Sequence, residues 1–184
     1  MSQSREQTRY TTGAVILHWL IALALIGQIG FGWFLTSVPR GIPARSFYVN
    51  LHKSTGLTLA VLILARLAWR LAHRPPPLPA FMRLWERNAA HWSHAALYAC
   101  MIGMPLSGYI ASNFSKYGVK LFNALTLPPW GVDDAHTYSI FNTTHVVLSY
   151  VFVALILVHI LAALRHAIAR DGVFSRMWRP VTRR

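Results

Sequence analysis

Histidines within long apolar segments are the residues of this sequence with the most chemical potential. The 184-residue chain contains nine histidines, and four of them, His18, His52, His145 and His159, fall in or at the edge of such segments. A histidine inside a membrane span is costly to leave unpaired and marks a functional site by default. Imidazole binds metals, forms hydrogen bonds and transfers protons, so these four are the first candidates for chemistry.

The spacing of these histidines predicts two pairs at different depths. His145 and His159 are 14 residues apart, which returns them to within roughly 40° of one helix face, about 21 Å apart along the axis. On the neighbouring apolar segments, His18 falls at the depth of His159 and His52 at the depth of His145. Two imidazoles on opposite helices, with a flat apolar group between them, are what six-coordinate haem b requires. The pattern therefore predicts two haem b groups.

Histidines in membrane spans also have other uses. A single histidine in a span is often a hydrogen-bonded packing residue, and a zinc or copper site needs three or four ligands at one depth. Each depth here has two histidines and almost no acid. The only cysteine, Cys100, excludes a four-cysteine iron–sulfur site and the attachment motif of c-type haem. His94 follows His91 at the start of the third apolar segment, and it remains an alternative to His18 or His159 as a ligand.

Two further residues repeat the 14-residue spacing. Gly32 lies 14 residues after His18, so a residue without a side chain is expected beside the outer haem. Arg66 lies 14 residues after His52, which puts a guanidinium near the inner haem, where a propionate would accept a bidentate hydrogen bond. An ordinary positively charged membrane anchor is the alternative for Arg66.

The elements that must position these residues are membrane helices. The chain is 54% apolar and 12% charged, whereas an average soluble domain has about 25% charged residues. Four apolar runs are each near the ~20 residues that cross a bilayer. We predict one all-α membrane domain over residues 1–184, a four-transmembrane-helix bundle enclosing two haem b groups. The expected spans are approximately 13–36, 51–72, 91–112 and 143–168. The first run is too rich in Trp and Gly for a signal peptide, so we expect it to be retained.

The basic residues predict the orientation of this bundle. Lys and Arg outnumber Asp and Glu by 18 to 5. Because the chain is so apolar, this excess indicates a membrane protein and not a nucleic-acid-binding protein. Thirteen of the 18 fall on the side shared by both termini and five on the other. Because cytoplasmic loops retain positive charge, we expect both termini in the cytoplasm. The thirteen are Arg5, Arg9, Arg66, Arg70, Arg74, Arg83, Arg87, Arg165, Arg170, Arg176, Arg179, Arg183 and Arg184.

Several short motifs together resemble the bacterial cytochrome b-561 family, and the resemblance covers all four apolar segments. It implies an inner-membrane protein with two haem b groups whose ligands are His18, His52, His145 and His159. The superoxide oxidase branch is the most similar, which implies transfer of electrons from periplasmic superoxide to ubiquinone. The motifs are His18-Trp19-Leu20, His52-Lys53-Ser54-Thr55-Gly56 with Arg66, His91-Trp92-Ser93-His94, Pro105-Leu106-Ser107-Gly108, and the pair His145 and His159.

The resemblance also places His166 near the quinone site. Independently, His166 is seven residues after His159, so it points the same way about 10 Å nearer the cytoplasm. A quinone needs hydrogen-bond donors and a proton source, and His166, with Arg66 or Arg165 nearby, is the candidate group. A polar residue that only extends to the membrane surface is the alternative for His166.

At the outer end, we expect a basic collar to attract a small anion to the haem edge. Lys53 is its catalytic candidate, and the other members are Arg40, Arg45, Lys116 and Lys120. Two other kinds of protein remain open. One is a cytochrome b subunit that passes electrons to or from a dehydrogenase, a hydrogenase or a soluble redox partner. The other is a membrane scaffold without redox function.

Overall fold

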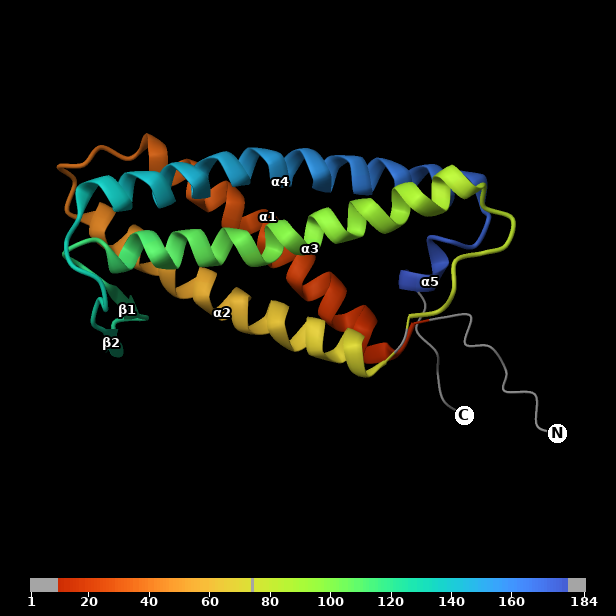
Figure 1. The fold of residues 1–184 in the computed structure, drawn as a ribbon, viewed down its shortest axis with the longest axis horizontal. Helices are drawn as coiled ribbons and strands as arrows, with labels where there is room; N and C mark the ends of the chain where they lie inside the picture. Colours follow the sequence, from red (N-terminus) through yellow and green to blue (C-terminus); the bar gives the residue numbers. More distant parts are fainter. Residues whose placement is uncertain (1–9, 74, 179–184) are drawn as a thin grey trace.

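Four long helices make up most of the chain in the computed structural model, which describes residues 10–73 and 75–178. They are α1 (Thr12–Ser37), α2 (Ala44–Ala72), α3 (Leu84–Asn113) and α4 (Ala135–Ala169), and a short helix, α5 (Ser175–Trp178), follows. All four long helices have the length and apolar composition needed to cross a membrane. They run alternately up and down the long axis of the molecule (Figure 1). The predicted four-helix membrane fold is confirmed.

Three of the helices begin earlier than the apolar runs suggest. α2, α3 and α4 start seven or eight residues before the expected spans, because polar first turns extend beyond the apolar segment. The carboxylate of Asp134 accepts hydrogen bonds from the backbone N–H groups of His136 and Thr137, which caps the start of α4. At the start of α3, the Glu86 carboxylate accepts a hydrogen bond from the backbone N–H of Arg83 at 3.1 Å.

The helices pack as two pairs. α1 packs along α2 and α3 along α4, while α2 also contacts α3. Within the described residues, α1 and α2 approach α4 less closely than α3 does. The buried core lies about midway along the bundle and includes Phe152, which is 1% exposed. Phe152 is seven residues from both His145 and His159, so packed apolar side chains separate the two histidine levels.

A β-hairpin covers one end of the bundle, and the sequence did not predict it. β1 (Val119–Leu121) pairs antiparallel with β2 (Leu125–Leu127), within a stretch expected only to join two helices. Positive φ angles at Phe122 and Asn123 form the tight turn. The fully buried hydroxyl of Ser54 on α2 accepts a hydrogen bond from the Phe122 N–H at 2.9 Å. This end is called the hairpin end below.

The opposite end, called the α5 end, gathers the start of α1, the end of α2, the start of α3 and the end of α4 (Figure 1). The described residues of the larger basic group belong to this end, and the five remaining basic residues belong to the hairpin end. Six members of the larger group lie outside the described residues: Arg5, Arg9, Arg74, Arg179, Arg183 and Arg184.

Candidate haem sites and proton-transfer site

His52 on α2 and His145 on α4 face each other near the hairpin end. Their ring centroids are 6.1 Å apart and their planes are nearly perpendicular, at 89°. The rings are half-buried and come from helices that do not pack closely on each other in the described part of the chain. This is one of the two pairings expected from the sequence.

The surroundings of His145 fix the position of its ring proton. Its Nδ1 lies 2.8 Å from the backbone carbonyl oxygen of Met104 on α3. A carbonyl oxygen only accepts hydrogen bonds, so Nδ1 carries the proton and the lone pair remains on Nε2. This hydrogen bond from the second ring nitrogen is the usual partner of a metal-binding histidine.

Gln28 on α1 contacts the ring of His52 in the opposite sense, because its amide N–H donates to Nδ1, so neutral His52 carries its proton on Nε2. Nε2 of Gln28 donates to the backbone carbonyl of His52 at 2.7 Å and lies 3.2 Å from the ring Nδ1. Its Oε1 accepts a hydrogen bond from the hydroxyl of Thr55 at 2.7 Å. α1 is therefore joined to α2 around His52 through one half-buried amide. Sequence reasoning missed Gln28, although a polar residue inside an apolar span is a recognisable signal.

Two glycines allow the rings of this pair to lie against neighbouring helices. A Cβ atom added at Gly32 on α1 would lie 3.0 Å from Cε1 of His52. One added at Gly108 on α3 would lie 3.0 Å from both Cε1 and Nδ1 of His145. The expected position of Gly32 beside the outer histidines is therefore observed, whereas the sequence did not predict that Gly108 lies against His145. Two imidazoles backed by glycine and a free Nε2 on His145 fit axial ligation of a haem.

Three histidines meet near the α5 end. The ring centroids of His18 and His159 are 6.3 Å apart, and those of His94 and His159 are 5.4 Å apart. The structure therefore brings the expected pair together but also brings His94 into the same space. His94 lies on α3, which packs directly on α4, whereas His18 lies on α1, which does not. A flat ring needs separated helices, so helix packing favours the gap between His18 and His159.

Arg66 occupies this level, as expected, but in a different contact. Its Nη1 lies 2.9 Å from Nδ1 of His18, and a guanidinium only donates hydrogen bonds. Neutral His18 then carries its proton on Nε2, unlike His145. Metal binding through Nε2 of His18 would require Arg66 to give up this contact, which would release the guanidinium for an anionic partner such as a carboxylate. Arg66 also lies 5.9 Å from the ring centroid of Tyr98.

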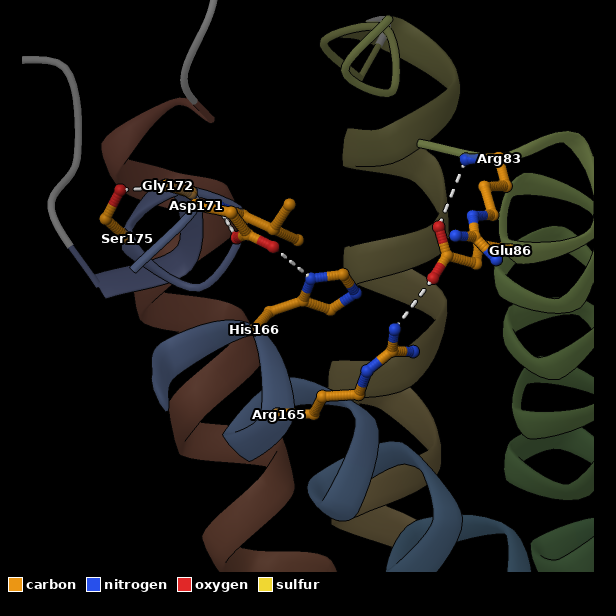
Figure 2. A network of polar contacts seen from close by, with 8 residues as sticks. Arg83, Glu86, Arg165, His166, Asp171, Gly172 and Ser175 are labelled. Atoms are coloured by element: carbon orange, nitrogen blue, oxygen red, sulfur yellow. Dashed lines mark hydrogen bonds and ion pairs between the residues drawn. The ribbon is translucent and has the colours of Figure 1, made fainter. Parts of the chain in front are cut away.

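His166 and Asp171 form a hydrogen-bonded pair at the end of α4 (Figure 2). Nδ1 of His166 is 2.5 Å from Oδ2 of Asp171. On the adjacent residue, Arg165 bonds Glu86 of α3 at 3.0 Å instead. The candidate proton donor thus has a carboxylate partner that sequence reasoning did not identify. The available signal was an acid directly after the last turn of the helix, followed by Gly172.

Lys53 is adjacent to His52 but its ammonium group is engaged. Its Nζ donates to the backbone carbonyl of Gly118 at 2.9 Å, which ties α2 to the start of the hairpin. The more exposed members of the expected collar are also at this end, where Nζ of Lys116 lies 4.0 Å from the Asp133 carboxylate. Lys53 therefore contributes a fixed, half-buried charge beside the His52 and His145 pair.

A multi-pass helical bundle with facing histidines at two levels defines the protein as a membrane protein of the cytochrome b class. Comparison with known proteins agrees: residues 9–180 match the prokaryotic cytochrome b561 family, and the chain belongs to that family. Membership implies haem b as cofactor and electron transfer in a membrane as function.

Two relatives match nearly the whole chain. Cytochrome b561 homolog 2 of Escherichia coli (strain K12) is 28% identical over 179 residues, covering 96% of this chain and 95% of the relative. A probable superoxide oxidase CybB of Yersinia pestis is 26% identical over 176 residues, covering 92% and 95% respectively. The full-length agreement means that all four helices contribute to the similarity.

Proposed function

We propose that this chain is a superoxide:ubiquinone oxidoreductase with two haem b groups in a bacterial inner membrane. His52 and His145 would hold one haem, and His18 and His159 the other. The single observation that carries the proposal is the presence of two facing imidazole pairs at two levels of one apolar bundle. The ring centroids are 6.1 Å apart in one pair and 6.3 Å apart in the other. The haems would supply one-electron redox chemistry, and bis-histidine ligation leaves no open coordination position for oxygen.

The hairpin end is proposed as the periplasmic end, where superoxide would react. The excess of basic residues at the α5 end supports this orientation. Lys53, Arg40, Arg45, Lys116 and Lys120 give the hairpin end a positive charge, and Asp133 and Asp134 oppose it locally. Such a field raises the encounter rate of a small anion and weakens as salt is added.

The α5 end is proposed as the site of quinone reduction. His166 would donate protons to a quinone carbonyl, and Arg66 or Arg165 would provide further hydrogen bonds. Two superoxide anions each lose one electron and become dioxygen, and one quinone gains two electrons and two protons and becomes quinol. Membrane lipid and ubiquinone would be the partners of this end. The relative named a probable superoxide oxidase supports this assignment.

Rapid mixing of the purified protein tests the proposal. A superoxide pulse is expected to reduce the haems, and a soluble ubiquinone analogue is expected to reoxidise them. Superoxide alone should leave the haems reduced, because their electrons have no acceptor. Haems that superoxide does not reduce, or that the quinone does not reoxidise, would contradict the proposed reaction. Reoxidation only on addition of a dehydrogenase or hydrogenase would favour the electron-transfer subunit.

A further inference from the structure

The chain turns back at the end of α4 and brings Asp171 against His166. Arg170 ends the helix in the left-handed region, with φ of 53°, and Gly172 continues the turn with φ of 86°. One carboxylate oxygen of Asp171 lies 2.5 Å from Nδ1 of His166, and the other accepts the backbone N–H of Val173 at 3.0 Å. The side chains of His166 and Asp171 are only 16% and 19% exposed.

Contacts from α5 hold this turn in place. The indole N–H of Trp19 on α1 donates to the backbone carbonyl of Met177 at 2.9 Å. Trp178 packs edge-on against Trp19, with ring centroids 5.5 Å apart. Arg176 donates to the backbone carbonyl of Pro77 at 2.6 Å. Asp171 is therefore part of a fixed corner between α4, α1 and the segment that precedes α3.

The neighbouring charges leave Asp171 available to His166. Arg165 is the basic residue adjacent to His166 in the chain, and it forms an ion pair with Glu86 of α3 (Figure 2). Glu86 in turn accepts a hydrogen bond from the backbone N–H of Arg83. Arg165 therefore bonds Glu86, while the hydrogen bonds of the Asp171 carboxylate go to His166 and to the Val173 amide.

An ionised carboxylate that is hydrogen-bonded to Nδ1 of a histidine determines the chemical role of Nε2. It keeps a proton on Nδ1, so Nε2 is the atom that gains and loses protons, and it balances the charge when both nitrogens are protonated. Burial raises the pKa of Asp171, but the hydrogen bonds from His166 and the Val173 amide lower it by more. The net pKa therefore lies below its ordinary value.

We propose that Asp171 is the positioning residue for His166 in quinone reduction. It would hold the ring in one tautomer and stabilise its protonated form, so that Nε2 delivers protons to the quinone carbonyl. For each quinone, two electrons arrive through the protein and two protons arrive from cytoplasmic water through Nε2, giving quinol. Asp171 itself neither gains nor loses a proton. The inference rests on the proposed reduction of quinone at this end.

The test is Asp171→Asn in the haem-loaded protein. An amide oxygen can still accept a hydrogen bond from Nδ1, but the negative charge is lost. We expect haem reoxidation by a ubiquinone analogue to slow about 10- to 100-fold, within the range that general acid catalysis contributes. KM for quinone and the rate of haem reduction by superoxide should stay within about twofold of wild type, because Asp171 is not expected to contact quinone or the hairpin end. The solvent deuterium isotope effect on reoxidation should rise.

Two controls separate charge at Nδ1 from a general effect. Glu86→Gln removes the other described carboxylate of this end, which bonds Arg165 and not His166, and should leave reoxidation within about twofold of wild type. Nitrogen-15 spectra of the His166 ring should show protonated Nδ1 in wild type and a mixture of tautomers in Asp171→Asn. An unchanged tautomer in that variant would contradict the inference without any activity measurement.

Failure of the proposed function and failure of the Asp171 role give different results. If quinone does not reoxidise the wild-type haems, the proposed function is wrong. If it does, and Asp171→Asn matches wild type in rate and isotope effect, the positioning role is wrong. Should Asp171→Asn not fold, Asp171→Glu keeps the charge and is expected within about fivefold of wild type, far above His166→Gln. Reoxidation by Asp171→Glu as slow as by His166→Gln would overturn the inference.

Discussion

The backbone carbonyl of Met104 and the imidazole of His145 are joined by a 2.8 Å hydrogen bond. α3 contributes no ligand to the proposed outer haem, yet it fixes the tautomer of a histidine on α4. The same helix supplies Gly108, against which the His145 ring lies. The proposed ligand is therefore oriented by a neighbouring backbone, and the consequences can be measured.

Replacing Gly108 by alanine should remove the outer haem selectively. The added Cβ would lie 3.0 Å from two atoms of the His145 ring, so the ring must move away from Met104. Loss of a supporting contact of this kind typically costs about 10- to 100-fold in metal affinity. Haem content per chain should fall from two toward one. Gly103→Ala is the matched control, because its Cβ would meet only a flexible methyl group of Leu148 at 3.4 Å. Equal haem content in both variants would contradict the prediction.

The choice between His18 and His94 should be settled by phenylalanine substitutions. Because α1 and α4 are separated where α3 and α4 are packed, His18→Phe is predicted to lose the inner haem and His94→Phe to retain both. Haem-to-protein ratios and reduced-minus-oxidised spectra of the two variants provide the measurement. Two haems in His18→Phe with one in His94→Phe would reassign the inner ligand to α3.

Neutralising the hairpin end should slow the reaction with superoxide. The double variant Lys116→Gln, Lys120→Gln removes two positive charges without touching the His52 and His145 pair. The second-order rate of haem reduction at low salt should fall about 3- to 10-fold, and its dependence on ionic strength should weaken. Arg83→Gln and Arg87→Gln at the α5 end are charge-matched controls that should have no effect on this step. A rate insensitive to salt in wild type would mean that charge does not guide the donor.

The corner that holds Asp171 should make a pH-dependent contribution to stability. A carboxylate whose folded pKa is depressed stabilises the fold above its unfolded pKa of about 3.9, and this stabilisation is lost as pH falls through the folded value. The difference in free energy of unfolding between wild type and Asp171→Asn should be about 1.5 kcal/mol near pH 7, the size of a hydrogen bond to a charged group. It should persist to about pH 5, begin to fall near the unfolded pKa of about 3.9, and disappear as the pH falls further through the lower folded pKa. Thermal denaturation in detergent across that range measures it, and a difference that grows in acid would contradict the assignment.

Much of the architecture could be predicted from the sequence because apolar length and helical repeat are strong local signals. The 14-residue interval between His145 and His159 fixes their common face whatever the loops do, and the proximity of His52 to His145 and of His18 to His159 follows from antiparallel helices. The same periodicity predicted the position of Gly32, which lies beside His52.

Features that depend on irregular backbone could not be predicted in this way. The contact between Asp171 and His166 needs a left-handed backbone conformation at Arg170, and an arginine in the sequence does not predict that conformation. The hairpin that engages Lys53 and Ser54 is built from two three-residue strands, too short for a periodic signal. The closeness of His94 to His159 depends on how tightly α3 packs on α4, which spacing along one chain does not determine.

The haem content of the purified wild-type protein tests whether both histidine pairs bind haem. If each facing histidine pair holds one haem, the chain carries two low-spin b haems, seen in reduced-minus-oxidised spectra and in the ratio of extracted haem to protein. We expect a ratio of two. A ratio of one would leave one histidine pair without its proposed haem, and a colourless protein would contradict both haem sites.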